Sequence, residues 1–149
     1  MSTRSIALVV SPSREEAVAA GSALAPLLLA AEFSLYTISE VDIPGVTRVA
    51  HNDLPDIEAA VVLGGDGTIL RAAEVTLGRN IPLLGINMGH VGFMAEVNRP
   101  SIGAIAECII AKSYVVENRM ILQFSVERDG ASIGNGWALN EVTVERDGT

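Results

Sequence analysis

The sequence predicts an α/β fold, and three features of its pattern support this. Short apolar runs rich in valine, isoleucine and leucine recur along the first two-thirds of the chain, and segments of helical character separate them. Apolar strands that alternate with helices are typical of a parallel sheet covered on both faces. After Tyr114 the pattern changes to long, alternating, strand-like sequence. We therefore expect a Rossmann-like parallel sheet with helices on both faces over about 1–112, followed over 113–149 by the beginning of a β-rich second domain.

The first strand and helix are expected at the N-terminus. The apolar, β-rich run "SIALVV" (5–10) predicts a strand. Ser13 and Glu16 match the spacing of a capping box, which would open a helix that runs to about Ala31. The run "FSLYTI" (33–38) then predicts the second strand.

The middle of the chain repeats this alternation after a longer connection. Residues 40–58 contain two prolines, a glycine and mixed charges, so we expect a loop excursion there. The run "AAVVL" (59–63) predicts the third strand, and "TILRAAEVTL" (68–77) predicts its helix. The remaining elements are a fourth strand and a further helix, expected at "IPLLGIN" (81–87) and "SIGAIAECIIAK" (101–112).

The last part of the chain shows no helical period. The stretches 114–130 and 136–148 alternate like strands, and the pentapeptide "VERDG" occurs in both, at 126–130 and 144–148. We expect each copy to be a strand that ends at an Asp-Gly turn. The second turn would belong to a hairpin without its return strand, which would leave open sheet edges. We therefore expect this sequence to be the N-terminal part of a longer protein.

Composition narrows the class of protein. The chain of 149 residues is long enough for a real core, with 49% hydrophobic and 19% charged residues. A net charge of −8 gives little support to nucleic-acid binding. No apolar run reaches membrane-spanning length and the N-terminus lacks a signal-peptide cleavage region, so we expect a cytoplasmic protein without a membrane partner. The single cysteine, Cys108, excludes an internal disulfide or a cysteine-only zinc site, and we expect it in the core.

The glycine-rich turn after the third expected strand is the strongest functional signal. In "GGDGT" (64–68) the glycines Gly64, Gly65 and Gly67 permit positive φ and close approach of a ligand, and Thr68 is expected to be the N-cap of the following helix. Bare N–H groups at such a turn attract phosphate. The turn is neither a Walker P-loop nor a Gly-x-Gly-x-x-Gly fingerprint.

Asp66 places a negative charge inside this phosphate-binding turn. One explanation is structural, because aspartate often caps a helix or tightens a turn. Two others are chemical: the carboxylate helps to hold Mg²⁺ that bridges phosphates, or it accepts the proton of an attacking hydroxyl. Phosphoryl transfer requires a phosphate cradle, a cation and a positioned nucleophile. An acidic protein needs additional positive charge for such chemistry, and a divalent metal is its usual source.

Three segments together resemble the NAD kinases: "GGDGTILRAAE" (64–74), "PLLGINMGHVGFMAEV" (82–97) and "LNEVTVERDG" (139–148). That family phosphorylates the 2′-hydroxyl of the adenosine ribose of NAD to give NADP. The Gly-Gly-Asp-Gly-Thr turn (64–68) is by itself only moderately specific, because phosphofructokinases and diacylglycerol or sphingosine kinases share it. The Asn-x-Gly-x-x-Gly-Phe stretch (87–93) and the later Asn-Glu pair make the combination specific. The resemblance covers roughly 59–147.

The resemblance implies roles for individual residues. Asp66 matches the catalytic aspartate that accepts the 2′-hydroxyl proton, and Gly67 beside it lines the substrate. Arg71 matches a position that contacts the nucleotide, although a surface arginine on an exposed helix face is the plain alternative. Asn140 and Glu141 match the pair that binds the dinucleotide, and without the resemblance they would be ordinary strand-end residues.

The loop after the fourth strand is implied to complete the site. Asn87, Gly89 and Gly92 lie in it, where ligands bind in open α/β sheets. Phe93 resembles an aromatic contact near the adenine, with packing under the loop as the alternative. The chain has only two histidines and offers no ligand set around His90, so no protein metal ligand is assigned. The family implies ATP, or polyphosphate as well, as phosphoryl donor, Mg²⁺ as cofactor, and a homo-oligomer (dimer or tetramer).

One family segment, similar to Thr-Pro-Thr-Gly-Ser-Thr-Ala-Tyr, is absent from these residues. It completes the NAD pocket, so the 149-residue chain alone is expected to be inactive. The leading prediction is therefore an ATP-dependent NAD kinase. Two alternatives stay open: a lipid kinase of the diacylglycerol or sphingosine type, and a nucleotide-binding fragment without chemistry of its own. Lipid kinases usually carry an Asn-Glu segment directly after the turn, which this sequence lacks.

Overall fold

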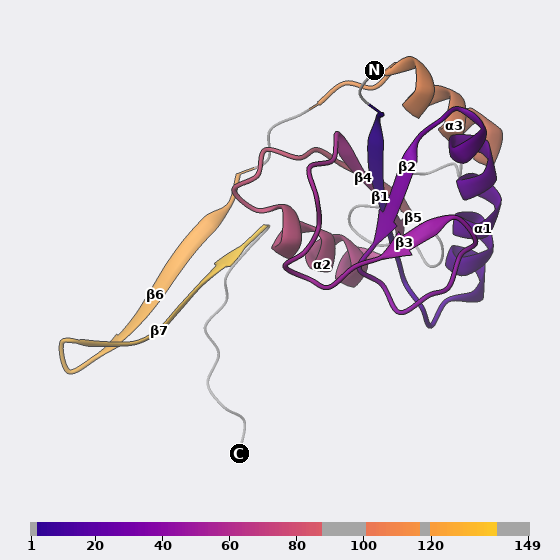
Figure 1. Ribbon diagram of the computed structural model, residues 1–149. Helices are drawn as coiled ribbons and strands as arrows, with labels where there is room; N and C mark the ends of the chain where they lie inside the picture. Colours follow the sequence, from indigo (N-terminus) through magenta and orange to yellow (C-terminus); the bar gives the residue numbers. More distant parts are fainter. Residues whose placement is uncertain (1–2, 88–100, 117–119, 140–149) are drawn as a thin grey trace. The chain divides into compact units, whose positions relative to one another are not determined.

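The computed structural model describes residues 3–87, 101–116 and 120–139 (Figure 1). The chain forms two compact units, Met1–Tyr114 and Val115–Thr149. The first unit contains a parallel sheet with helices, and the second contains an antiparallel hairpin.

The first unit is built on a five-stranded sheet in the order β3-β2-β1-β4-β5, and every pair of neighbouring strands is parallel. The chain begins at the centre with β1, moves outward to β2 and β3, and returns to the other side of β1 as β4 and β5. This arrangement confirms the predicted fold class. The strands are β1 (Ser5–Val10), β2 (Ser34–Thr37), β3 (Val46–Arg48), β4 (Ala59–Gly64) and β5 (Leu83–Asn87).

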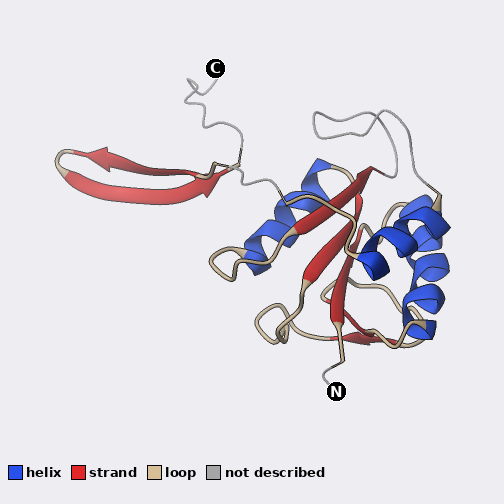
Figure 2. Cartoon of the chain, turned by 90° about the horizontal axis from the view of Figure 1, so that it is seen from above, coloured by secondary structure: helices blue, strands red, loops and turns tan. Residues whose placement is uncertain are grey.

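Three helices cover the sheet: α1 (Glu15–Ala30), α2 (Asp66–Thr76) and α3 (Ile102–Ala111). Helices α1 and α3 lie on one face and α2 lies on the other (Figure 2). Alternate residues of β1 face the two sides: Leu8 packs in the cluster beneath α1 and α3, and Val9 packs in the cluster beneath α2. Because both faces are covered, β1 and β4 are almost wholly buried, which is why their sequences are continuous apolar runs.

None of the helices in the described part of the chain has the length and apolar character needed to cross a lipid bilayer.

The second unit shows strands β6 (Leu122–Arg128) and β7 (Ala131–Ala138), which pair antiparallel. Asp129 and Gly130 connect them with φ values of 51° and 81°. Two successive positive φ angles are the signature of a type I′ turn, the turn that Asp-Gly favours. The prediction for "VERDG" at 126–130 is therefore confirmed, and the second copy at 144–148 lies outside the described residues.

Several local predictions were wrong. The expected loop over 40–58 contains the strand β3, which has three residues and pairs on one side with β2. Helix α1 begins two residues after Ser13, and its N-cap is Arg14 without a side-chain cap hydrogen bond, so the predicted capping box does not open the helix. Cys108 is half-buried rather than part of the core, and its Sγ donates to the carbonyl of Ser113 at 3.6 Å.

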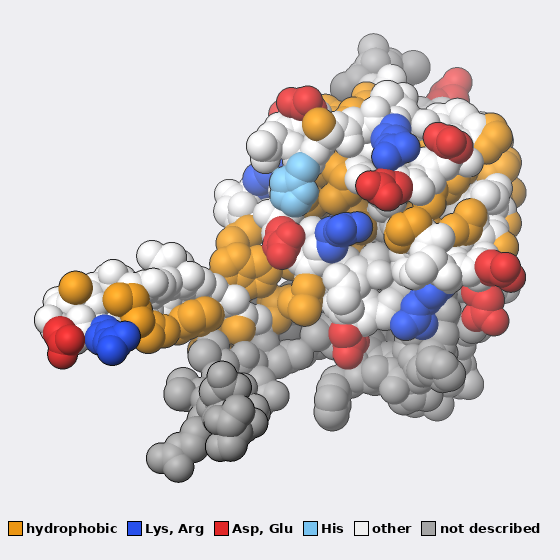
Figure 3. Space-filling model, turned by 90° about the horizontal axis from the view of Figure 1, so that it is seen from below, with side chains coloured by type: hydrophobic (Ala, Val, Ile, Leu, Met, Phe, Trp, Pro, Cys, Tyr) orange, Lys and Arg blue, Asp and Glu red, His pale blue; other side chains and the backbone are white. Residues whose placement is uncertain are grey.

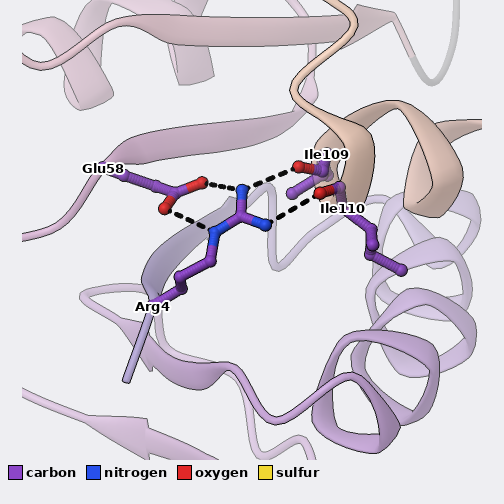
Figure 4. Close-up of polar contacts among 4 residues, drawn as sticks. All are labelled: Arg4, Glu58, Ile109 and Ile110. Carbon is purple, nitrogen blue, oxygen red and sulfur yellow. Dashed lines mark hydrogen bonds and ion pairs between the residues drawn. The ribbon is translucent and has the colours of Figure 1, made fainter. Parts of the chain in front are cut away.

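Arg4 joins three elements at the amino ends of the strands (Figure 4). Its guanidinium bonds both carboxylate oxygens of Glu58 and donates to the carbonyls of Ile109 and Ile110 at 2.9 and 2.8 Å. It also lies 4.5 Å above the ring of Phe33. The hydrogen bond with Glu58 raises the pKa of Arg4. Arg4 therefore adds side-chain donors to carbonyls at the C-terminal end of α3, one of which, that of Ile109, also accepts the N–H of Lys112 at 3.3 Å.

Candidate functional site

The order of the strands creates a switch point between β1 and β4. After β1 the chain turns toward β2, and after β4 it turns toward β5 on the opposite side. The loops that follow these two neighbouring strands therefore diverge and leave a crevice at the carboxyl edge of the sheet. Ligands of open α/β sheets bind at such a point. The GGDGT turn follows β4, so it lies at this crevice.

A pocket of about 390 Å³ occupies the crevice. Its two walls are the loop between β1 and α1 and the beginning of α2, which are far apart in the sequence. The lining residues are Val10, Ser11, Pro12, Ser13 and Arg14 from the first wall, and Gly65, Gly67, Thr68 and Arg71 from the second.

The first wall is held by hydrogen bonds to both neighbouring strand ends. The N–H of Ser11 donates to the carbonyl of Leu63 at the end of β4, at 3.0 Å. The N–H of Val10 donates to Oγ of Ser39 at 2.9 Å, and Ser39 is fully buried beyond the end of β2. A buried hydrogen-bonded hydroxyl fixes backbone position, because losing the bond leaves the N–H unsatisfied. The loop between β1 and α1 is thus tied on two sides.

The second wall begins one turn earlier than predicted. Helix α2 starts at Asp66 with Gly65 as its N-cap, and the N–H groups of Thr68 and Ile69 both donate to the carbonyl of Gly65 at 3.1 Å. Thr68 is therefore the third residue of the helix, and its predicted N-cap position is wrong. The N–H groups of Asp66 and Gly67, as the first two of the helix, have no acceptor within it and are available to an anion.

Of the glycines in the turn, Gly64 is needed for space, and none of the three has a positive φ. Positive φ occurs at Gly45, Gly78 and Gly130 among the described glycines, and not at Gly64 or Gly65. A Cβ on Gly64 would lie 2.4 Å from Oγ1 of Thr68. The expectation of close approach is therefore met at this position, and the expectation of unusual backbone angles is not.

Asp66 is half-buried at the first position of α2. Its carboxylate forms no hydrogen bond or ion pair with the described residues, and the N-cap is its neighbour Gly65. A carboxylate in the first helical turn is favourable because it faces the positive end of the helix dipole. Asp66 does not line the pocket itself, although Gly65 and Gly67 on either side of it do. The carboxylate is thus unpaired beside the pocket.

Two arginines approach the pocket from opposite walls. Arg71, one turn into α2, is exposed and lines the pocket as expected of a ligand-contacting residue. Arg14, which sequence reasoning did not select, lies against the turn: its Nη2 is 3.3 Å from the position that a Cβ on Gly65 would occupy. Neither arginine forms an ion pair within the described part of the chain. The feature of the sequence that could have identified Arg14 is its position in the loop after β1, the strand that pairs with β4.

The other predicted site residues are placed only in part. Asn87 ends β5 and pairs in register with Gly64, so its backbone lies at the same edge of the sheet as the turn. The remaining predicted residues lie outside the described residues; they are Gly89, Gly92, Phe93, Asn140 and Glu141. No group of three or more His, Cys, Asp or Glu side chains suited to a metal ion lies together among the described residues.

Comparison with known proteins identifies the family. Residues 6–114 match the family described as "ATP-NAD kinase N-terminal domain". This match covers most of the chain. The chain belongs to the NAD kinase family. The resemblance found in the sequence is thereby confirmed, and none of the matches supports the lipid kinase alternative.

Individual NAD kinases match over different lengths. The NAD kinase of Leifsonia xyli subsp. xyli is 39% identical over 153 aligned residues, covering 96% of this chain and 50% of that protein. The enzyme of Corynebacterium diphtheriae is 46% identical over 101 residues, covering 66% of this chain and 32% of that protein. The NAD kinase of Mycobacterium bovis is 47% identical over 89 residues, covering 60% of this chain and 29% of that protein. The chain thus spans half or less of the length of these relatives.

A solved structure shares the fold. The structure described as yeast NADH kinase complexed with NADH superposes with a TM-score of 0.73 at 16% identity. The match covers 93% of this chain and 47% of that one. At this identity the match supports the NAD kinase fold, that is, the parallel sheet with helices and the antiparallel strands that follow it.

Proposed function

We propose that the full-length protein transfers the γ-phosphoryl group of ATP to the 2′-hydroxyl of the adenosine ribose of NAD, giving NADP and ADP. The observation that carries this proposal is the carboxylate of Asp66, which begins α2 beside a pocket with two arginines and has no partner among the described residues. Family membership supplies the substrates, because the matching family is an ATP-NAD kinase. The proposal concerns the whole protein, since this chain spans only part of its relatives.

In the proposed reaction Asp66 acts as the general base. Its carboxylate accepts the proton of the 2′-hydroxyl while the hydroxyl oxygen forms a bond to the γ-phosphorus and the bond to the bridging oxygen of ADP breaks. ADP leaves with the electron pair of that bond. Positioned acid–base catalysis of this kind contributes about 10²–10⁴-fold to a rate. Arg71 and Gly67 contact the dinucleotide from α2, and Phe93, Asn140 and Glu141 are proposed to complete its binding.

Magnesium fits this site as an ion shared with the substrate. Mg²⁺ is usually held by one or two carboxylates together with substrate phosphates rather than by an all-protein cage. Holding this ion is the alternative role of the Asp66 carboxylate, which has no competing partner among the described residues. When bound, Mg²⁺ neutralises charge on the phosphates of the donor. We also propose that the enzyme works in the cytoplasm as a homo-oligomer, as expected from the family.

The proposal is tested with Asp66→Asn in the full-length protein. NADP formation is followed from NAD, ATP and Mg²⁺ with an NADP-specific dehydrogenase as the detecting enzyme. We expect turnover to fall by about 10²-fold or more, because the amide cannot accept the proton. Asp56→Asn is the matched control, since Asp56 is a fully exposed carboxylate whose contact is with Arg79 at 3.6 Å. Wild-type turnover in Asp66→Asn would refute the role of the carboxylate, and absence of NADP from the wild-type protein would refute the function.

A further inference from the structure

We infer that the pocket between the loop after β1 and the start of α2 binds the linked phosphates of the phosphoryl donor, and that Arg14 is the residue that holds them. This inference rests on the proposed function, because it assigns one of the two substrates to a definite part of the same site. It concerns the phosphate chain, which ATP and inorganic polyphosphate share.

The chemistry of the pocket lining suits a polyanion. The side chains that line it include two guanidinium groups, Arg14 and Arg71, and three hydroxyl groups, Ser11, Ser13 and Thr68. Among the described residues that line it there is no aspartate or glutamate, although the chain as a whole has a net charge of −8. Guanidinium groups bind phosphate through paired, charge-assisted hydrogen bonds, and hydroxyl groups donate to the remaining oxygens. The lining is therefore locally cationic in an acidic protein.

Arg14 lies over the GGDGT turn, and no ion-pair partner for it is found in the part of the chain that the structure describes. Its Nη2 lies close enough to Gly65 that a Cβ there would be 3.3 Å away. Its backbone N–H donates to the carbonyl of Ser11 at 3.3 Å, and Ser11 is itself bonded to the end of β4. The guanidinium therefore lies beside the positive end of α2, and these two sources of positive charge attract anions. The carboxylate of Asp66 in the same turn supplies one negative charge, and the phosphate chain of the donor supplies further negative charge.

The order of the strands separates the donor from the acceptor. The expected acceptor residues lie on α2 and, through Asn87, at the end of β5, which neighbours β4 on one side. Arg14 follows β1, which neighbours β4 on the other side. The GGDGT turn lies between them. In phosphoryl transfer the attacking and leaving oxygens lie on opposite sides of the transferred group. Gly67 and Arg71, which are proposed to contact NAD, line the pocket from α2, and Arg14 lines it from the loop after β1. With NAD on the β5 side, the donor phosphates belong on the β1 side of this pocket, next to Arg14.

The test compares Arg14→Gln with Arg48→Gln in the full-length protein. Arg48 is an exposed arginine at the end of β3, which β2 separates from β1, so it provides the same change of charge away from the pocket. We expect Arg14→Gln to raise the KM for ATP by about tenfold or more, as for the loss of a hydrogen bond to a charged group, while the KM for NAD stays near the wild-type value. Arg48→Gln is expected to change neither constant.

A second measurement does not depend on turnover. Calorimetric titration with inorganic tripolyphosphate and, separately, with a non-hydrolysable ATP analogue is expected to show weaker binding of both to Arg14→Gln, and partial recovery in Arg14→Lys. Weaker binding of the nucleotide alone would overturn the assignment to the phosphate chain. An increased KM for NAD with unchanged ATP binding would place Arg14 on the acceptor side, and unchanged binding of both probes would also overturn the inference.

The two proposals fail in different ways. If the wild-type protein forms no NADP, the proposed function fails, and the binding titrations still decide whether Arg14 holds phosphates. If NADP forms and Arg14→Gln binds both phosphate probes like the wild type, the function stands and the inference fails. Should Arg14→Gln not fold, Arg14→Lys takes its place, because it keeps the charge and loses only the paired donors. Weaker phosphate binding to Arg14→Lys would support the inference, and unchanged binding would overturn it.

Discussion

Gly64→Ala provides the sharpest test of how the turn is built. Gly64 is the last residue of β4 and is buried. A Cβ placed on it would lie 2.4 Å from Oγ1 and 2.8 Å from Cβ of Thr68. Both distances are far inside van der Waals contact, and the Cβ of Thr68 cannot move without moving α2. We therefore expect the methyl group to displace the start of α2 relative to β4.

The expected cost follows from overpacking a tightly packed site. Inserting one methyl group into such a site destabilises a protein by about 1–3 kcal/mol. For a protein of 150–250 residues, each kcal/mol lowers the melting temperature by about 2–4 °C, so Gly64→Ala should lower it by about 2–12 °C. Gly67→Ala is the matched control, because a Cβ there meets nothing within 4 Å and Gly67 lies in the helix. It should raise stability by about 0.4–1 kcal/mol.

Differential scanning calorimetry of the full-length variants measures both changes. Adding Thr68→Ala to Gly64→Ala removes the nearest atom, Oγ1, and should recover part of the loss, which a double-mutant cycle would report as coupling between the two sites. A melting temperature for Gly64→Ala equal to that of the wild type would refute the reasoning. So would an equal loss in Gly64→Ala and Gly67→Ala, because a general intolerance of side chains in the turn would then explain both.

Two further predictions concern stability, each with an internal control. Ser101→Ala should lower the free energy of unfolding by about 1 kcal/mol, because Oγ of Ser101, the N-cap of α3, accepts the N–H of Ala104. Ser13→Ala, the control, should lower it by almost nothing, since Ser13 does not cap α1. Urea denaturation measures both, and an equal loss would restore the rejected capping box. Arg4→Met should lower the free energy of unfolding by about 1 kcal/mol after allowance for the partial exposure of Arg4. Arg79→Met should change it by close to zero, because the ion pair of Arg79 with Asp56 is exposed. Thermal melts that rank the two variants in the opposite order would contradict the role of Arg4.

The elements that the sequence predicted best are the ones buried on both faces. The runs at 5–10 and 59–63 became β1 and β4 because a central strand of a covered sheet needs an apolar side chain at every position. The Asp-Gly turn at 129–130 was equally clear, since few dipeptides adopt two positive φ angles. In both cases one local physical requirement decides the residue types, so the sequence alone carries the information.

The features that were missed depend on contacts between distant segments. Strand β3 has three residues and exists through its pairing with β2, so nothing in 46–48 alone distinguishes it from a loop. Ser13 and Glu16 had the spacing of a capping box, yet the loop after β1 is held by Leu63 and Ser39 in a position that makes Arg14 the N-cap. Tertiary hydrogen bonds outweighed the local preference.

Arg14 was also missed because its place beside the turn depends on contacts between distant segments. Its position bears on how an acidic chain can attract phosphate. A chain with net charge −8 should repel phosphates at long range, but screening limits such repulsion to about 8 Å at physiological ionic strength. The Lys and Arg side chains on the face shown in Figure 3 are separate from one another and form no broad basic patch among the described residues of that face. Attraction must then come from groups within direct contact of the ligand. In the proposed assignment Arg14 and Arg71 supply it from opposite walls of one pocket, and the N-terminus of α2 adds to it between them. The carboxylate of Asp66 lies beside this pocket rather than in its lining, so the acid and the proposed phosphate site are neighbours that do not coincide.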